Sequence, residues 1–452
     1  MGIFTLVGTT VVVVKYITVA SHCFFAKLRN ANSRNTVISE RRLILEMSIV
    51  STDLFRLLLL GVVACLAPLL IYITRAHILP VVVLEIVGGI IIGPQVLHWV
   101  YVDPILRYLS LMGLSYLLFL SGLEVDLERL RGRIMIFVGS SFLLSLGLAL
   151  LVGFSLFAIG QVTSPLLLTI ILVSTSLGIV IPILKDAGES STDFGQLVIA
   201  GATLGEFGSI ILLSLFFSSE ANSPAAKVAL FGIFATLILL VSLAVFNVHR
   251  TTWFTDMEHR FQDSTSQINV RIALTLLVGF VTLAYGFGSE AILGAFLAGV
   301  ALRIVYKETA GLRPLLRIKI EALGFGFFVP IFFIISGVDF NLYALFTNVS
   351  IMLLVPVFLA GLLLVRGVPA ILYRQRLDSR HTAIAGLFQA TSLTFIVAAT
   401  QIGMQLGLIT SALSAALVAA GLLSVIIYPL FALTLLDRSK GNEKRVPSKE
   451  LL

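Results

Sequence analysis

Charged residues are scarce in this chain of 452 residues, because Asp, Glu, Lys and Arg make up only 12% of it. That is about half their usual share in a soluble protein. The two cysteines, Cys23 and Cys65, lie in apolar stretches and provide neither a metal-binding spacing nor a disulfide framework. A Walker motif, a Rossmann glycine fingerprint and an HExxH motif are also missing. These absences argue against an enzyme and against any tightly held cofactor or metal.

Hydrophobic residues make up 58% of the chain, and the mean hydropathy is +1.05. Runs of about 20 apolar residues recur along the chain, each long enough to cross a bilayer as a helix. The net charge of +7 comes from the loops between these runs, so it indicates membrane topology rather than nucleic-acid binding. We predict an all-α integral membrane protein with about thirteen transmembrane helices. They are 54–75, 78–99, 105–123, 134–159, 165–184, 196–218, 226–247, 270–288, 290–306, 320–338, 350–373, 381–404 and 410–436.

Lys and Arg are concentrated in one set of alternating loops and in the basic tail 439–452. Because positive loops stay in the cytoplasm, we expect a cytoplasmic C-terminus. The first 46 residues do not fit this pattern. Either residues 3–26 form an extra helix, or the protein starts at Met47; we favour Met47, which makes 1–46 an extension of the membrane domain 47–438. The cytoplasmic membrane of a bacterium is the predicted location.

Two halves of the chain resemble each other. FLSGLEVDL (119–127) matches IISGVDFNL (334–342) at an offset of 215, and VSTSLG (173–178) matches QATSLT (389–394) at an offset of 216. GGIIIG and GAFLAG each carry two glycines five residues apart. Matched segments lie seven spans apart, and because seven is odd the second copy has inverted topology. Inverted repeats are typical of secondary transporters; chance similarity between apolar segments is the alternative.

Such repeats predict a binding site at the bilayer midplane, where helices break. The fifth span carries Thr175, Ser176 and Gly178 at its middle. The twelfth carries Gln389, Thr391 and Ser392. We interpret both segments as unwound crossings whose free backbone groups bind a cation. The alternative is that these hydroxyls bond to carbonyls of their own helices, as is common in membrane helices.

Ionisable residues inside a membrane invite a functional hypothesis. Glu206 lies at the middle of the sixth span, with Thr203 one turn before it, and we predict that it binds both the proton and the cation. Arg366, within the eleventh span, is the predicted counter-charge, pairing with Glu206 when no cation is bound. Glu85 lies two turns into the second span and either is structural or lines an access path.

The stretches VVVLEIVGGIIIGPQVL, LSYLLFLSGLEVDLERLR, AILGAFLAGVALR and FGFFVPIFFIISGVDF, with the Thr-Ser-Leu-Gly crossover and the Arg366 span, resemble the monovalent cation:proton antiporter superfamily. Within it, they are similar to the bacterial Kef-type and sodium/proton antiporter branch. The resemblance implies homodimers in which a core moves against a scaffold. Its implied division is scaffold spans 54–123 and 270–338, a linker helix 226–247, and core spans 134–218 and 350–437.

The resemblance also assigns the family's essential acidic position to Glu206, its basic position to Arg366 and its crossover residues to Thr175, Ser176, Gln389, Thr391 and Ser392. The family usually has Asp at the acidic position, preceded by Asn, Asp or Gln, whereas this chain has Gly205 and Glu206. The expected function is exchange of Na⁺ or K⁺ for protons across the lipid bilayer. The alternatives are a receptor or channel with the same fold, or a transporter of another small solute.

Overall fold

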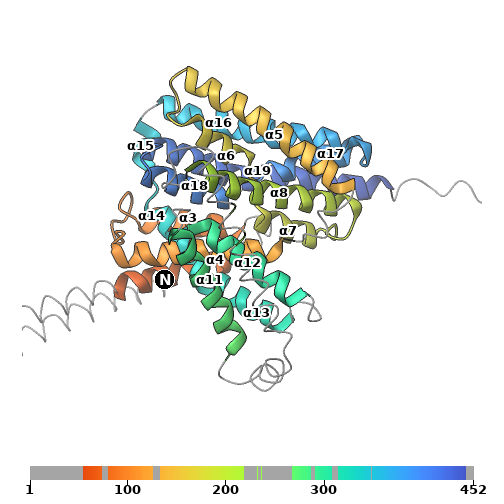
Figure 1. The fold of residues 1–452 in the computed structure, drawn as a ribbon. Helices are drawn as coiled ribbons and strands as arrows, with labels where there is room; N and C mark the ends of the chain where they lie inside the picture. Colours follow the sequence, from red (N-terminus) through yellow and green to blue (C-terminus); the bar gives the residue numbers. More distant parts are fainter. Residues whose placement is uncertain are drawn as a thin grey trace, which may run out of the picture. The chain divides into compact units, whose positions relative to one another are not determined.

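Figure 1 shows the fold in a computed structural model, which describes residues 54–73, 80–125, 133–217, 232, 236, 267–286, 291–307, 314–347 and 349–443. All regular secondary structure in these residues is helical, as predicted. Ten helical segments within them are long and apolar enough to cross a membrane, and two shorter apolar helices accompany them. The chain is therefore an all-helical, multi-pass membrane protein.

The described helices have the following bounds. The chain is helical over Leu54–Ile73, followed by α3 (Val81–Ile92), α4 (Pro104–Glu124), α5 (Arg133–Ala158), α6 (Pro165–Val173), α7 (Leu177–Asp186) and α8 (Asp193–Phe217). Next come α11 (Ile268–Gly286), α12 (Ala291–Lys307), α13 (Pro314–Leu323), η1 (Gly324–Phe328), α14 (Val329–Val338) and α15 (Leu342–Thr347). The last are α16 (Val349–Leu362), η2 (Leu363–Gly367), η3 (Val368–Gln375), α17 (Ser379–Gln389), α18 (Thr394–Gln405) and α19 (Ser411–Glu443).

Some predicted segments lie outside the described residues. These are the extension 1–46, the linker helix 226–247 apart from two of its positions, and the tail from 444 onward. The chain divides after Leu58 into two units, and the helices that build the candidate site all belong to the second, Leu59–Leu452. Residues 54–58, the described part of the first unit, are helical.

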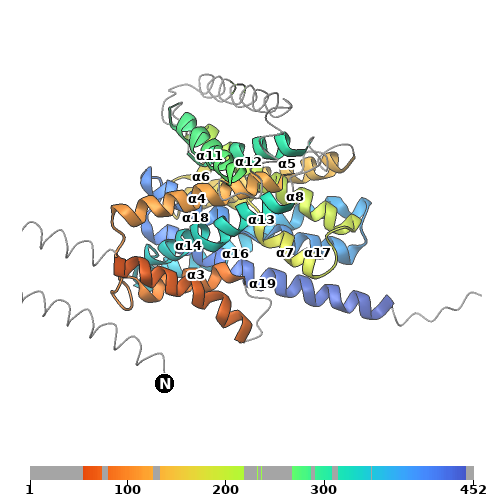
Figure 2. The same ribbon diagram turned by 90° about the horizontal axis from the view of Figure 1, so that it is seen from below.

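Two close helix crossings reflect the repeat. Helix α3 packs against α14, and α4 packs against α12 (Figures 1 and 2). A Cβ on Gly89 would lie 3.0 Å from Gly337 Cα, and a Cβ on Gly122 would lie 3.1 Å from Gly299 Cα. Glycine permits such backbone contact between membrane helices. The first crossing joins spans two and ten, and the second joins spans nine and three. The repeat pairs span two with span nine and span three with span ten, so the two crossings are equivalent.

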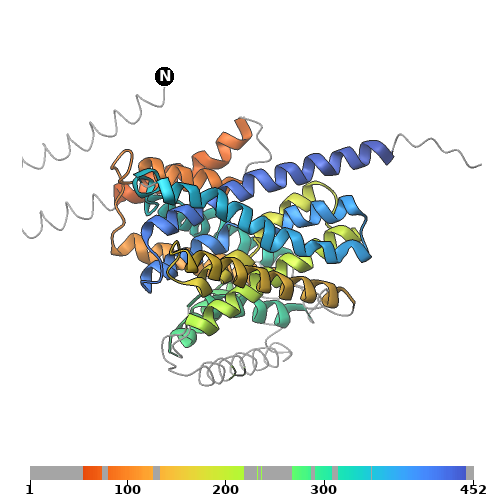
Figure 3. The same ribbon diagram turned by 90° about the horizontal axis from the view of Figure 1, so that it is seen from above.

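The remaining site-building helices contact one another. Helix α8 contacts α5, α6, α7 and α17, and α6 contacts α18. Helix α19, the dark-blue helix of Figure 3, packs along α16, α17 and α18. This second group also contacts the first group, α3, α4, α12 and α14, for example where α8 packs against α12. The fifth and twelfth spans thus lie in the middle of this second group.

Replacing Gly122 with Ala should weaken the crossing of α4 and α12. The new methyl group would meet backbone atoms, including Val300 N at 3.0 Å, which cannot rotate away as a side chain would. Overpacking of this kind costs about 1–3 kcal/mol, so the temperature of thermal unfolding in detergent should fall. The control is Gly147→Ala in α5, where nothing lies within 4 Å of the added carbon; equal unfolding temperatures for the two variants would contradict the crossing.

Candidate functional site

The fifth and twelfth spans are both interrupted within their length, as predicted. Helix α6 ends at Val173 and α7 begins at Leu177, while α17 ends at Gln389 and α18 begins at Thr394. Polar residues fill both breaks, and Ser174, Thr175, Ser176, Thr391 and Ser392 are completely buried. A break in a membrane helix releases backbone N–H and C=O groups that find no water there. These groups therefore need partners within the protein.

The two breaks are partners for each other. The backbone N–H of Ser176 donates to the Thr391 carbonyl (2.9 Å), and the Ser176 hydroxyl accepts from the N–H groups of Leu393 (2.8 Å) and Thr394 (3.1 Å). The hydroxyls of Ser174 and Ser392 lie 2.7 Å apart. One interrupted span thus provides the hydrogen bonds that the other has lost.

Glu206 joins this crossing to another helix. Its side chain, 3% exposed, projects from α8 and accepts two hydrogen bonds. The N–H of Leu177, at the start of α7, donates to Oε2 (2.8 Å), and the Ser121 hydroxyl of α4 donates to Oε1 (3.0 Å). The N-terminus of a helix carries a partial positive charge, which favours an ionised carboxylate. A carboxylate can therefore be held here, deep in the protein.

Arg366 binds four elements together. It projects from the π-helical turn η2, a conformation that recurs at functional sites. Its Nε donates to Thr175 Oγ1 (2.8 Å), and its Nη2 donates to the Gly201 carbonyl (2.9 Å) and to Oε1 of Gln389. Its Nη1 makes a longer contact with Ser145 Oγ (3.5 Å). A single guanidinium thus connects both breaks with α8 and α5.

The predicted ion pair between Arg366 and Glu206 is not formed in this structure, since each side chain has other partners. The guanidinium lies over Gly205 instead, because a Cβ on that glycine would be 2.6 Å from Nη2. Gly205 therefore leaves room for the charged group of another helix. The role of Arg366 as a counter-charge stays a prediction.

Three other predicted site residues, Thr203, Gly178 and Glu85, lie in three different surroundings. Thr203 is buried and donates its hydroxyl to the Ile199 carbonyl of its own helix (2.8 Å). Gly178 faces open space, because a Cβ added there would have nothing within 4 Å of it. Glu85 is buried in α3, a helix that packs against α14 and provides no member of the crossing.

Sequence reasoning misses several partners. In the sequence, Ser121 is notable only as part of the repeated Ser-Gly motif. In the structure, that motif lies where α4 faces Glu206. Gly201 contributes a carbonyl, and a Cβ there would be 2.8 Å from Tyr373 Oη. Ser424 of α19 donates to the Ser392 carbonyl (2.9 Å). A backbone carbonyl and a distant hydroxyl leave no pattern in the sequence.

The described residues contain no group of three or more His, Cys, Asp or Glu side chains that could hold a metal ion tightly. What they do bring together is one carboxylate, several hydroxyls and the backbone groups of two helix breaks. Hard cations prefer oxygen ligands of these kinds. Such a set suits weak, reversible binding of a small cation in competition with a proton.

A bundle with repeated halves and a polar crossing at its centre is typical of membrane transporters. The sequence pattern of the family described as "Sodium/hydrogen exchanger, transmembrane" matches residues 61–436. The chain therefore belongs to the sodium/hydrogen exchanger family, whose members are transporters and not enzymes. This confirms the resemblance found in the sequence.

The chain is also similar to proteins named as antiporters. The chain is 30% identical to the putative Na⁺/H⁺ antiporter YjbQ of Bacillus subtilis (strain 168) over 414 residues, covering 87% of this chain but 65% of YjbQ. It is 26% identical to the Na⁺/H⁺-K⁺ antiporter GerN of Bacillus cereus, covering 77% of this chain and 88% of GerN. The structure of the sodium proton antiporter MjNhaP1 from Methanocaldococcus jannaschii at pH 8 matches with a TM-score of 0.61 and 17% identity, covering 85% of this chain and 98% of that one. That last likeness concerns the fold alone.

Replacing Gly205 with Ala should displace Arg366. The methyl group would lie 2.6 Å from Nη2 and 3.2 Å from Thr175 Oγ1, and the guanidinium cannot move without breaking its hydrogen bonds. We expect a loss of about 1–3 kcal/mol in stability, measured as a lower temperature of thermal unfolding in detergent. Gly178→Ala is the matched control, because its added carbon meets nothing. If both variants unfold at the same temperature, Gly205 does not accommodate the guanidinium in the way described.

Proposed function

We propose that the protein exchanges a monovalent cation, Na⁺ or K⁺, for protons by alternating access, with the Glu206 carboxylate shared by both ions. The observation that carries this proposal is the double hydrogen bonding of a buried carboxylate, by the N-terminus of a broken helix and by Ser121 of α4. The names of its relatives, Na⁺/H⁺ antiporters, support it.

Electrostatics would couple the transport of the cation to that of the proton. An uncompensated charge in the middle of a membrane costs several kcal/mol, so Glu206 crosses the membrane with either a proton or a cation. A cation bound to Glu206 would take further oxygen ligands from Thr175, Ser176 and Thr203. Because one carboxylate binds one ion at a time, the simplest stoichiometry is one proton for one cation. Arg366 is then a positioning residue that holds the crossing together and also serves as counter-charge.

In the same proposal, the helices around the crossing form the moving core: spans 134–218 and 350–437. Spans 54–123 and 270–338 form the scaffold, which would also provide the contact of a homodimer. Ser121 supports this division, because it reaches Glu206 from a scaffold helix, and movement of the core would break that hydrogen bond. The C-terminus would face the cytoplasm and the protein would lie in the cytoplasmic membrane.

The first experiment is proton flux in everted vesicles that contain the protein, with Na⁺, K⁺, Rb⁺ or Li⁺ added in turn at several pH values. Movement of protons against one of these cations is the expected result, and it would also identify the ion. Passive flow of one ion without counter-flow would indicate a channel. No flux with any cation, with folded protein shown in the membrane, would favour a receptor or a transporter of another small solute.

Glu206→Gln should abolish exchange, because an amide can neither release a proton nor neutralise a cation. The variant should still reach the membrane, since its amide oxygen can accept from the Leu177 N–H while its NH₂ group donates to the Ser121 hydroxyl. The control is Asp193→Asn, which removes an exposed carboxylate from the first turn of the same helix and should leave the exchange rate within about twofold, as for other surface substitutions. Normal exchange by Glu206→Gln would disprove the proposed site.

A further inference from the structure

A cleft of about 590 Å³ opens beside the crossing. Its lining includes Glu124 at the end of α4, Lys185 of α7 and Thr203 of α8. Thr203 lies one helical turn from Glu206, so the cleft reaches close to the proposed ion site. Under the predicted orientation, this cleft faces the cytoplasm.

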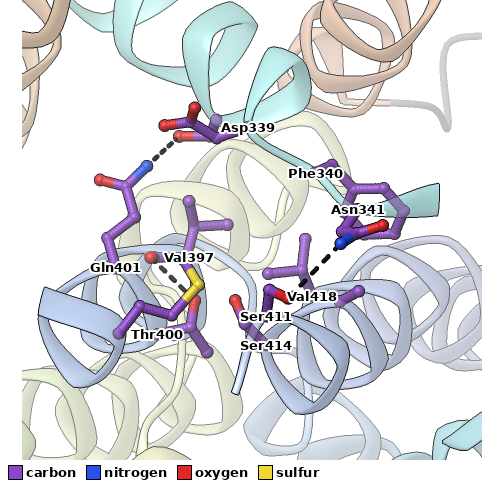
Figure 4. A pocket seen from close by; sticks show the side chains of 12 residues that line it. Asp339, Phe340, Asn341, Val397, Thr400, Gln401, Ser411, Ser414 and Val418 are labelled. Carbon is purple, nitrogen blue, oxygen red and sulfur yellow. Dashed lines mark hydrogen bonds between the residues drawn. The ribbon is translucent and has the colours of Figure 1, made fainter. Parts of the chain in front are cut away.

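Figure 4 shows a second cavity, with Asp339 and Gln401 on one side and Asn341, Ser411 and Ser414 on the other. Its volume is about 20 Å³, which is room for about one water molecule. Two hydrogen bonds join residues of its lining, from Gln401 Nε2 to Ser336 Oγ (2.8 Å) and from Asn341 Nδ2 to Ser411 Oγ (3.4 Å).

The two cavities are related by the repeat. Glu124 corresponds to Asp339 at the offset of 215 that relates the two Ser-Gly motifs. At the offset of 216, three further residues of the cleft fall on residues of the small cavity. These pairs are Ile181 with Val397, Lys185 with Gln401, and Ile199 with Ala415. Equivalent positions of the two halves thus line a wide cavity in one half and a narrow one in the other.

Glu124 and Asp339 lie at opposite ends of helix α4, and so on opposite sides of the membrane if α4 spans it. Helix α4 carries Arg107 near its start and Glu124 at its end, 17 residues later, which is about 25 Å along a helix. Arg107 Nη2 lies 3.4 Å from Asp339 Oδ2, so Asp339 belongs to the starting end of α4. Burial raises the pKa of Asp339, and the nearby charge of Arg107 opposes that rise.

Glu124 lines the wide cleft. Its Oε2 is buried and has no hydrogen-bond partner among the residues that the structure describes. The cleft also contains Glu321, but Arg317 binds that carboxylate at 2.5 Å.

We propose that Glu124 and Asp339 are a symmetry-related pair of mouth carboxylates, each of which first receives the alkali cation on its own side of the membrane. Glu124 lines the wide cleft in this structure, whereas Asp339 lines the narrow cavity and is paired with Arg107. When the core moves, the small cavity widens, Arg107 releases Asp339, and the cleft at Glu124 closes. This inference rests on the proposed cation:proton exchange, and it adds residues that act before the cation reaches Glu206.

Measurements in vesicles of both orientations test the pair. With Na⁺ or Rb⁺ added outside everted vesicles, Glu124→Gln should raise the KM for the cation by about tenfold, because a carboxylate in a cleft concentrates cations. In right-side-out vesicles its effect should be under about twofold, since that mouth lacks Glu124. Asp339→Asn should show the reverse pattern. A purely structural role would instead lower the amount of protein or the maximal rate in both orientations.

The control is Glu321→Gln, which removes a carboxylate from the same cleft that already has a partner. It should change the KM by less than about twofold, as for most surface substitutions. Equal effects of Glu124→Gln in both orientations, or an equal effect of Glu321→Gln, would overturn the proposal. Absence of exchange in the unaltered protein would instead refute the proposed function. The labelling measurement below would then still test whether the cavity at Asp339 is narrow.

That measurement uses labelling by a membrane-impermeant maleimide in a protein with Cys23→Ser and Cys65→Ser. Lys185→Cys should react from the cytoplasmic side, and Ser414→Cys, in the lining of the small cavity, should react slowly from the other side. Adding Arg107→Gln should speed the reaction of Ser414→Cys by about two- to fivefold, the range expected for loss of a half-exposed ion pair. Fast reaction of Ser414→Cys without Arg107→Gln, or no change with it, would contradict the narrow mouth at Asp339.

Discussion

A helix that breaks inside a membrane must find partners for the backbone groups that the break releases. Here the requirement is met by pairing two breaks, so that Ser176 accepts from Leu393 and Thr394 while its own N–H donates to Thr391. Neither interrupted span could be stable alone. The positions of α6, α7, α17 and α18 are therefore fixed together, and the free N-terminus of α7 is left to bind Glu206.

Arg366 also stabilises the crossing through hydrogen bonds. A guanidinium buried without a carboxylate partner needs several acceptors, and Thr175, Gly201 and Gln389 provide them from three different elements. Gly205 is part of this arrangement, because any side chain there would occupy the space of the guanidinium. The Gly-Glu pair, which departs from the pattern of the resembling family, thus has a structural reason: the position before the carboxylate accommodates Arg366 instead of contributing a ligand.

Much of the fold could be predicted because hydrophobic length and repeated motifs are properties of the sequence. The Thr-Ser-Leu motifs located both breaks, and isolated charges in apolar runs located Glu206 and Arg366. The partners of those charges could not be predicted, because charge alone pairs Glu206 with Arg366. Their actual partners include a backbone N–H, a backbone carbonyl and Ser121, which only the folded chain brings within 3.0 Å of Glu206.

The inverted repeat also explains how one chain could hold two states of similar free energy. Equivalent residues of the two halves line a wide cleft on one side and a narrow cavity on the other. On the proposed function, exchange of roles between the halves gives the second state, in which the cavity at Asp339 is wide and the cleft at Glu124 is narrow. The crossing pairs each half with the other through Ser176, Thr391, Leu393 and Thr394. On the proposed function, this pairing and the hydrogen bond from Leu177 to Glu206 move together with the core, while the hydrogen bond from Ser121 belongs to one state only, so the mouths change around a carboxylate that keeps its place at the crossing.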